Sequence, residues 1–143
     1  MKKITLLSGA ISLALISLLF VSCEKEKPLS EAIIGKWDVQ TVQQVYYLQD
    51  VKEFETTFFM KPGQLAYEFT SGGSIILYQD GDVFGTSNYT LTGNKLIIEA
   101  GDQDMEWDKV SVDGNTLTWT EYETDVINEE NFDVEVNFTA TGN

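Results

Sequence analysis

The sequence predicts an all-β protein, an antiparallel up-and-down meander of eight strands that closes as a barrel. Three observations support this prediction. Apolar side chains recur at every second position after about residue 35, short groups of Gly, Asp and Asn separate these segments, and the segments are short and evenly spaced. Such a pattern is typical of a barrel or a sandwich. Closure removes the exposed edges of an open meander, which favours the barrel.

The last strand shows the period most clearly. Residues 131–139, Asn-Phe-Asp-Val-Glu-Val-Asn-Phe-Thr, alternate apolar and polar side chains without a break, which predicts a half-buried antiparallel strand. In chain order the eight predicted strands are residues 36–42, 66–70, 74–79, 86–92, 94–100, 105–113, 116–122 and 131–140. Turns are predicted at residues 71–73, 80–82 and 113–115, because each contains glycine, which adopts a positive φ without strain.

Two segments do not follow the alternating pattern, residues 31–34 and residues 46–60. The second, "YYLQDVKEFETTFFM", is rich in aromatic residues and is compatible with a strand, a loop or a short helix. A helix would place Val51, Phe54 and Phe58 on one face. The sequence leaves these alternatives open.

Residues 1–22 are typical of a secretory signal peptide. Met1-Lys2-Lys3 is positively charged, and residues 4–21 are apolar apart from threonine, serine and glycine. The apolar run approaches the length of a spanning helix, so an uncleaved membrane anchor is the competing interpretation. The junction Phe20-Val21-Ser22-Cys23 resembles a bacterial lipobox, in which a small residue precedes an obligatory cysteine, although leucine is usual where Phe20 stands.

This resemblance implies that Cys23 is a lipid anchor. In proteins with a lipobox the cysteine sulfur receives a diacylglycerol, the leader is cleaved before it, and the new amine is acylated. Two or more acyl chains, at about 0.8 kcal/mol per buried methylene, attach a protein stably to membrane lipid. A buried or reactive thiol is the alternative, but the charged run at residues 24–27 is not the start of a core.

Residues 23–32 are then an acylated amino terminus and a polar tether, and residues 33–143 form the folded domain. Glu24 follows the cysteine in place of the aspartate that retains some lipoproteins in the inner membrane. We therefore expect the protein in the cell envelope of a Gram-negative bacterium, anchored in the outer membrane. Its exposure to the periplasm or to the cell surface stays open.

Gly35-Lys36-Trp37 stands at the entrance to the first strand, and apolar Ile33-Ile34 precedes it. This segment resembles the Gly-x-Trp signature of lipocalins, so the chain resembles a small bacterial lipoprotein with a lipocalin-like barrel over about residues 33–140. The resemblance implies that Trp37 lies at the closed end of the barrel, with a helical turn at Ile33-Ile34 as a plug. Lipocalins stack an arginine across that tryptophan, and this chain has no arginine. The departure favours a divergent relative whose closed end is sealed by Lys36 or by aromatic packing.

The family resemblance also implies a cup for a small apolar ligand, lined from inward strand positions. The candidate lining residues are aromatic: Trp37, Tyr67, Phe69, Tyr89, Trp119, Phe132 and Phe138. Aromatic residues at this spacing more often form a packed core, and a barrel filled by them has no cavity. The expected function is a non-catalytic binding module. The alternative is a solid-core interaction or structural lipoprotein that contacts another cell-envelope protein.

Composition argues against other classes of protein. From Cys23 onward seven lysines face 23 acidic residues, a net charge of −16 that would repel nucleic acid. The chain has no histidine and one cysteine, which removes imidazole catalysis, histidine zinc ligands and an internal disulfide. We expect no enzyme activity and no cofactor. The alternating acids of residues 102–108 could bind calcium, but they are also typical of a solvated strand face, and we predict no metal site.

Overall fold

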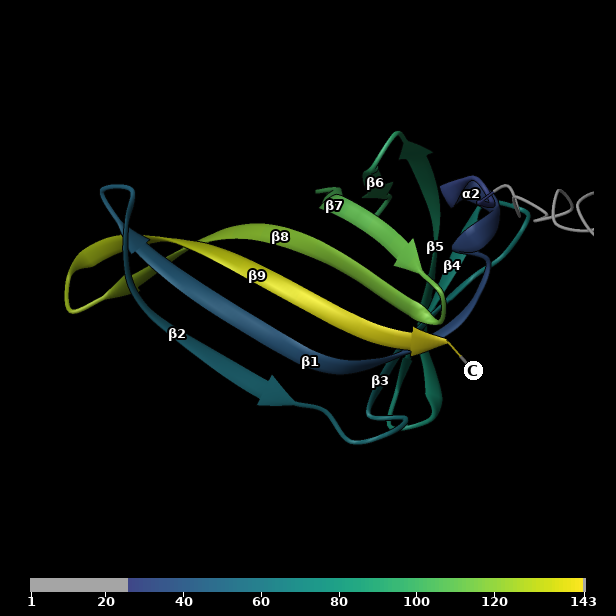
Figure 1. Ribbon diagram of the computed structural model, residues 1–143, viewed down its shortest axis with the longest axis horizontal. Helices are drawn as coiled ribbons and strands as arrows, with labels where there is room; N and C mark the ends of the chain where they lie inside the picture. Colours follow the sequence, from purple (N-terminus) through teal and green to yellow (C-terminus); the bar gives the residue numbers. More distant parts are fainter. Residues whose placement is uncertain (1–25, 143) are drawn as a thin grey trace, which may run out of the picture.

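The computed structural model describes residues 26–142. Residues 1–25, which include the predicted signal peptide and Cys23, lie outside the described part. The described elements are α2 (Leu29–Ala32), β1 (Gly35–Leu48), β2 (Val51–Phe59), β3 (Leu65–Phe69), β4 (Ser74–Gln79), β5 (Asp82–Thr92), β6 (Lys95–Ile98), β7 (Met105–Asp113), β8 (Thr116–Ile127) and β9 (Glu130–Gly142) (Figure 1). Among them no helix is both long and apolar enough to cross a membrane.

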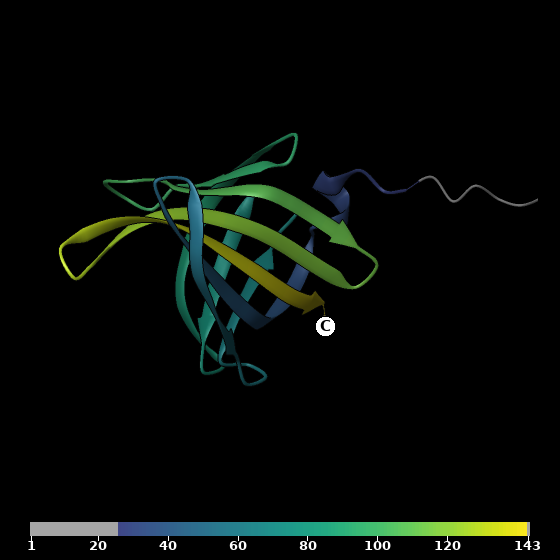
Figure 2. The same ribbon diagram turned by 60° about the vertical axis from the view of Figure 1, so that its left-hand side comes forward.

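Eight of the nine strands form a closed antiparallel barrel. The strands pair in the order β1-β3-β4-β5-β6-β7-β8-β9, and β9 pairs back with β1. Figure 2 shows these strands wrapping around a common interior. The predicted all-β barrel is confirmed, because each of the eight predicted strands overlaps one barrel strand. The remaining strand, β2, lies outside the barrel and was not among the predicted strands.

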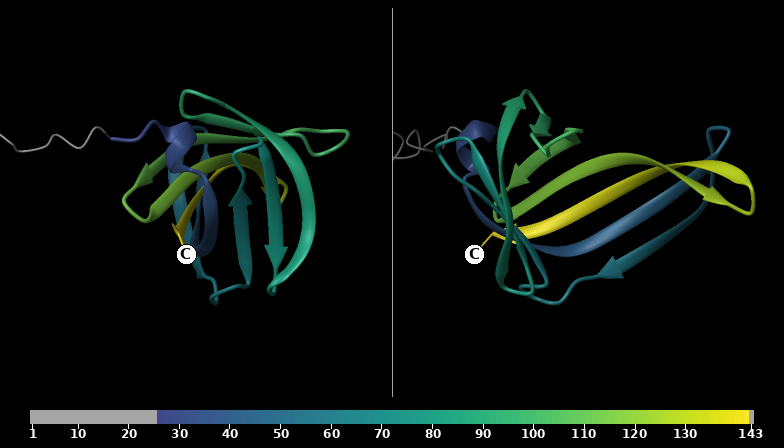
Figure 3. Two further views of the ribbon diagram at one scale, coloured as in Figure 1. Left: turned by 90° about the vertical axis from the view of Figure 1, so that its right-hand side faces the viewer. Right: turned by 180° about the vertical axis from the view of Figure 1, so that it is seen from behind.

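The long strand β1 belongs to two parts of the sheet. Gly35–Asp38 pairs with β3, whereas the later part of the same edge pairs with β2 from Thr41 to Leu48. The hairpin of β8 and β9 also continues past the barrel, as far as Ile127 and Glu130. A four-stranded sheet, β2-β1-β9-β8, therefore extends from the barrel; we call it the extension (Figures 1 and 3).

The segment left undecided from the sequence, residues 46–60, contains the end of β1, a tight turn and β2. Gln49 and Asp50 form the turn, with φ values of 50° and 65°. Two successive positive φ values are those of a type I′ hairpin turn, whose twist matches that of the flanking strands. The aromatic residues of this segment stabilise the extension, since Tyr46 stacks on Phe54 with ring centroids 4.3 Å apart.

The core of the barrel is a stack of three aromatic rings. Trp107 lies 4.2 Å from Trp119 and Trp119 lies 4.7 Å from Phe138, measured between ring centroids, with planes tilted by 14° and 2°. Tyr67 and Phe69 on β3 meet Trp107 edge to face, at 4.9 and 6.0 Å. Offset stacked and edge-to-face contacts are the favoured geometries of aromatic pairs. The aromatic residues thus form one cluster that joins β3 to β7, β8 and β9.

The end of the barrel next to α2 is closed by apolar packing. Ile33, directly after α2, is fully buried, and its carbonyl oxygen accepts a 2.7 Å hydrogen bond from the indole Nε1 of Trp37. Lys36 does not contribute to this seal. Its Nζ lies over the ring of Tyr78, 3.7 Å from the centroid, and the hydroxyl of Tyr78 donates to Glu68. The contacts seen at this end are those of buried Ile33 and Trp37.

Candidate functional site

An apolar pocket lies between β3 and β7, and its lining combines buried residues with exposed Phe84 and Met105. Its volume is about 250 Å³. The lining is mainly aliphatic: Tyr67, Ile75, Leu77, Phe84, Gly85, Thr86, Ser87, Ile98, Ala100 and Met105. Strand registry places the side chains of β4, β5 and β6 toward a common interior, because Leu77 pairs with Gly85 and Ile98 with Met105. Concave, mostly apolar pockets of this kind are the usual form of small-molecule sites.

The pocket exists because β5 presents small residues inward. Gly85 and Ser87 occupy successive inward positions on this strand, whereas β7 and β8 carry Trp107 and Trp119. A Cβ atom placed on Gly85 would meet no heavy atom within 4 Å. The pairing of β4 and β5 also shifts register directly beside the pocket, between Leu77 and its neighbour. The missing side-chain volume on β5 leaves the space unfilled.

One polar side chain of the lining is deeply buried. Tyr67 is 9% exposed. Burial raises the pKa of its hydroxyl, and the negative charge of Glu121 raises it further. The ring itself is fixed, because it contacts Trp107 and Trp119 edge to face at 4.9 and 5.7 Å. Tyr67 is therefore a buried phenol whose ring is held in place and whose raised pKa keeps the hydroxyl protonated.

Glu121 on β8 is half-buried near the aromatic core. Its Oε1 accepts a 3.0 Å hydrogen bond from the indole Nε1 of Trp119. Burial raises the pKa of the carboxyl group, which this hydrogen bond opposes, and the neighbouring Glu123 raises it further. The other core tryptophan, Trp107, is fully buried, and its Nε1 has no partner within residues 26–142. Polar groups of Tyr67, Glu121 and Trp107 thus lie among the apolar side chains of the core.

The seven lining residues predicted from the sequence all lie in or against the core. Tyr67 lines the apolar pocket. Tyr89 faces a different hollow beside α2, and its hydroxyl donates to the carbonyl of Thr70 at 3.2 Å. Phe132 packs in the extension, where its ring meets Tyr46 and Phe54. The remaining four, Trp37, Phe69, Trp119 and Phe138, pack in the barrel core without lining the apolar pocket.

Most of the pocket lining was not among the predicted residues. Ile75, Leu77, Ile98 and Met105 are aliphatic and looked like ordinary inward strand positions. One feature of the sequence does indicate the pocket: the small residues Gly85 and Ser87 at alternate positions of β5. Small inward residues mark the place where a barrel wall leaves space.

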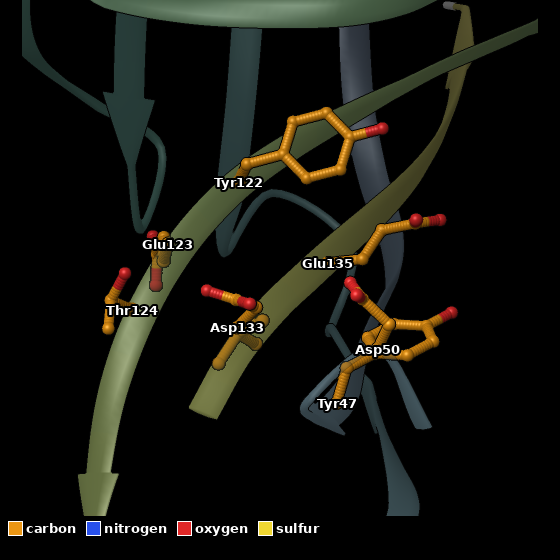
Figure 4. Close-up of a pocket in the computed structure, with 8 residues that line it drawn as sticks. Tyr47, Asp50, Tyr122, Glu123, Thr124, Asp133 and Glu135 are labelled. Atoms are coloured by element: carbon orange, nitrogen blue, oxygen red, sulfur yellow. The ribbon is translucent and has the colours of Figure 1, made fainter. Parts of the chain in front are cut away.

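A second hollow lies on the extension and is polar. Its volume is about 590 Å³, and it is widely open (Figure 4). Carboxylates from β8, β9 and the first hairpin turn surround it: Glu123, Asp133, Glu135 and Asp50, beside Tyr47, Tyr122, Thr124 and Val134. At one side Lys109 pairs with Glu135 at 3.5 Å. Within residues 26–142 no group of three or more acidic, histidine or cysteine side chains is suited to hold a metal ion.

The alternating acids of residues 102–108 lie partly in the loop before β7. Glu106 and Asp108 are on the strand, where Lys95 of β6 approaches both carboxylates at 2.6 and 4.0 Å. These side chains form a solvated face with a cross-strand ion pair, the second of the two interpretations that the sequence allowed.

No protein-family model matches the chain, and no curated protein matches it either. The structure itself therefore defines the class. The chain is a closed eight-stranded antiparallel β-barrel protein with one added strand and a small apolar pocket in the barrel.

Proposed function

We propose that this chain is a membrane-anchored, lipocalin-like binding module that holds a small apolar ligand in its barrel and catalyses no reaction. The observation that carries the proposal is the aliphatic pocket of about 250 Å³ beside Gly85. Closed barrels of eight strands have an interior that either fills with side chains or holds one small ligand. Here the aromatic cluster fills part of the interior, and the space next to β5 is left for a ligand.

The size of the pocket bounds the ligand. A cavity of ~150 Å³ lined by Leu, Ile and Phe holds benzene. By proportion a pocket of about 250 Å³ holds a molecule of about ten non-hydrogen atoms. This range includes short alkyl chains and single-ring compounds.

A substitution that fills the pocket tests the proposal. Gly85→Leu places an alkyl side chain in the pocket, and the backbone tolerates it because Gly85 does not have a positive φ and its Cβ direction is open. The matched control is Thr90→Leu, which places the same leucine side chain on the exposed outer side of β5. Decane is titrated into purified protein and tryptophan fluorescence is recorded.

We expect decane to bind the unmodified protein and the Thr90→Leu variant equally, and to bind the Gly85→Leu variant at least tenfold more weakly. Equal binding by all three proteins would place the decane elsewhere and overturn the proposal. The absence of decane binding in the unmodified protein would overturn it as well.

The anchoring part of the proposal rests on the lipobox-like junction at Cys23, which lies outside the described residues. Cys23→Ala removes the sulfur that would receive the lipid. We expect the unmodified protein to fractionate with the outer membrane and to carry the mass of acyl chains, and the variant to lose that mass. A variant of unchanged size that still fractionates with the membrane would contradict the assignment.

A second candidate function, an interaction or structural lipoprotein, is favoured by the surface of β2. This strand pairs only with β1, so its outer edge is unpaired within residues 26–142. It exposes Phe54, Phe58 and Phe59, the last at 79%. A photo-crosslinking residue at position 59 tests this candidate in intact cells. A single discrete adduct, absent when the crosslinker is at position 90, would favour it; the absence of any adduct would remove it.

A further inference from the structure

We infer that the outer edge of β2 is a docking site for an extended, basic segment of another protein. This segment adds to the extension as a further strand and alternates basic with apolar side chains. The inference rests on the second candidate function, because it states the chemistry of the partner. It is independent of the ligand proposed for the pocket, since no residue of β2 lines that pocket.

The backbone of β2 is paired on one side only. β2 is the edge strand of the extension (Figure 1), and within residues 26–142 its single partner is β1. It is nine residues long and contains no proline. Natural proteins commonly shorten, charge or cover their edge strands, because an exposed row of N–H and C=O groups is a template for a further strand. An extended peptide can therefore pair along β2 by strand addition.

One face of the extension offers exposed aromatic surface beside this edge. Phe54 and Phe58 pair with Tyr46 and Val42 of β1, so they share the face that carries these two buried side chains. The two phenylalanines are themselves 43% and 49% exposed, because no strand lies beyond them. Exposed apolar surface of this kind marks interaction sites. Apolar residues at alternate positions of an added strand would cover both rings.

The opposite face of the extension is acidic. Glu55 of β2 and Glu135 of β9 pair with Val45 of β1 from its two sides, so both lie in one row across this face. The polar hollow lies on the same face, since Glu135 lines it together with Asp133 (Figure 4). Lys52 offsets part of the charge, with its Nζ 2.6 Å from Glu55. The remaining side chains of an added strand would therefore meet carboxylates.

The charge of the extension selects the occupant of the edge. Residues 43–59 and 121–137 contain ten acidic residues and one lysine, a net charge of −9. A second copy of this chain would bring an equal negative charge to the same place. Like charges placed opposite each other on neighbouring strands are destabilising. Basic side chains on the added strand replace this repulsion with attraction, which favours a basic partner over a second copy.

A nine-residue peptide that alternates lysine with valine tests the inference, because its length matches that of β2. Its binding to purified protein is measured by calorimetry at low ionic strength, where exposed charges are least screened. Amide hydrogen exchange then locates the contact. We expect the peptide to bind and to slow exchange in residues 51–59. Exchange in β3 should not change, because both edges of that strand are already paired.

A second peptide separates strand pairing from simple charge attraction. It carries proline in place of the two inner valines, so it keeps every lysine but loses two N–H groups and the regular strand conformation. We expect this peptide to bind roughly tenfold more weakly, which is the effect of one or two lost hydrogen bonds. It should leave exchange in residues 51–59 unchanged.

Two charge reversals assign the attraction to the acidic face. Glu55→Lys should bind the lysine–valine peptide roughly fivefold more weakly, because a like charge then lies beside the added strand. Glu31→Lys is the matched control, since it makes the same change of charge at an exposed position of α2. It should bind the peptide as the unmodified protein does. Unchanged exchange in the barrel strands shows that both variants are folded.

The outcomes separate this inference from the proposed functions. Absence of peptide binding, equal binding of the proline peptide, equal effects of the two charge reversals, or slower exchange only outside β2 would each overturn it. Exchange in β2 that slows as protein concentration rises, without peptide, would show a second copy at the edge and overturn it as well. Decane binding in the pocket would stand in all these cases, and so would an adduct at position 59 with a partner of other chemistry.

Discussion

The indole Nε1 of Trp37 donates a 2.7 Å hydrogen bond to the backbone carbonyl of Ile33, and this bond joins α2 to the first barrel strand. Both residues are buried. A helix of one turn has little stability of its own, so α2 depends on this hydrogen bond and on the burial of Ile33. The closed end of the barrel is therefore set by a contact between residues four positions apart.

Trp37→Phe tests this contact. The variant keeps an aromatic ring but leaves the Ile33 carbonyl unpaired, which should lower the free energy of unfolding by about 1–3 kcal/mol. Amide hydrogen exchange should accelerate in α2 more than in the barrel strands. Trp107→Phe is the matched control, because its Nε1 has no partner within residues 26–142. If both variants accelerate exchange in α2 equally, the hydrogen bond does not hold the helix.

Phe54→Ala tests what holds β2 on the barrel. Phe54 stacks on Tyr46 at 4.3 Å and meets Phe132 edge to face at 6.0 Å. Because Phe54 is half-exposed, its truncation should cost roughly 1–2 kcal/mol, less than for a fully buried ring. Exchange of the β2 amides should rise while that of β3 and β4 is unchanged. Phe59→Ala, at a position that is 79% exposed, should have no more than a small effect. Equal effects of the two variants would contradict this description.

Glu121→Gln tests the buried carboxyl group through pH. The folded-state pKa of Glu121 is raised, chiefly by burial. Its protonated form therefore favours the folded state at low pH, and that contribution is lost as pH rises through the raised pKa. We expect Glu121→Gln to be more stable than the unmodified protein at pH 7, and the difference to shrink as pH falls through the raised pKa and to vanish below the unfolded-state pKa of about 4.3. Urea unfolding across this range measures it.

Glu53→Gln is the control for that series, since Glu53 lies on β2 and is exposed. This variant makes the same isosteric change at the surface and is measured in the same urea series. A Glu121→Gln variant that is less stable than the unmodified protein at pH 7 would show that the charged carboxylate stabilises the fold, in contradiction to the raised pKa.

The barrel strands were predictable because each has one apolar face, and alternation records that face directly in the sequence. The extension was not predictable in this way. Its two tight turns, Gln49–Asp50 and Asn128–Glu129, contain no glycine although all four residues have positive φ. The strands beside them are exposed, so their side chains alternate weakly. As a result β8 and β9 continue beyond the predicted limits, to Ile127 and from Glu130.

The pocket was less predictable than the barrel for a different physical reason. Whether an inward side chain lines a cavity or fills the core depends on the volumes of the residues across the barrel from it. Trp107 and Trp119 stack on each other and so fill space together, whereas Gly85 leaves space to be filled. Strand registry decides which of these residues face one another, and registry is not recorded in the alternation of a single strand.

The central claim, that a small apolar ligand occupies the pocket beside Gly85, is tested most directly by the methionine methyl groups. The chain has three methionines; Met105 lines the pocket and Met60 packs against the core elsewhere. In a ¹³C-methyl NMR spectrum of purified protein, addition of decane should shift the Met105 resonance and leave the Met60 resonance in place. A shift of Met60 with Met105 unchanged, or no shift of either, would contradict the claim.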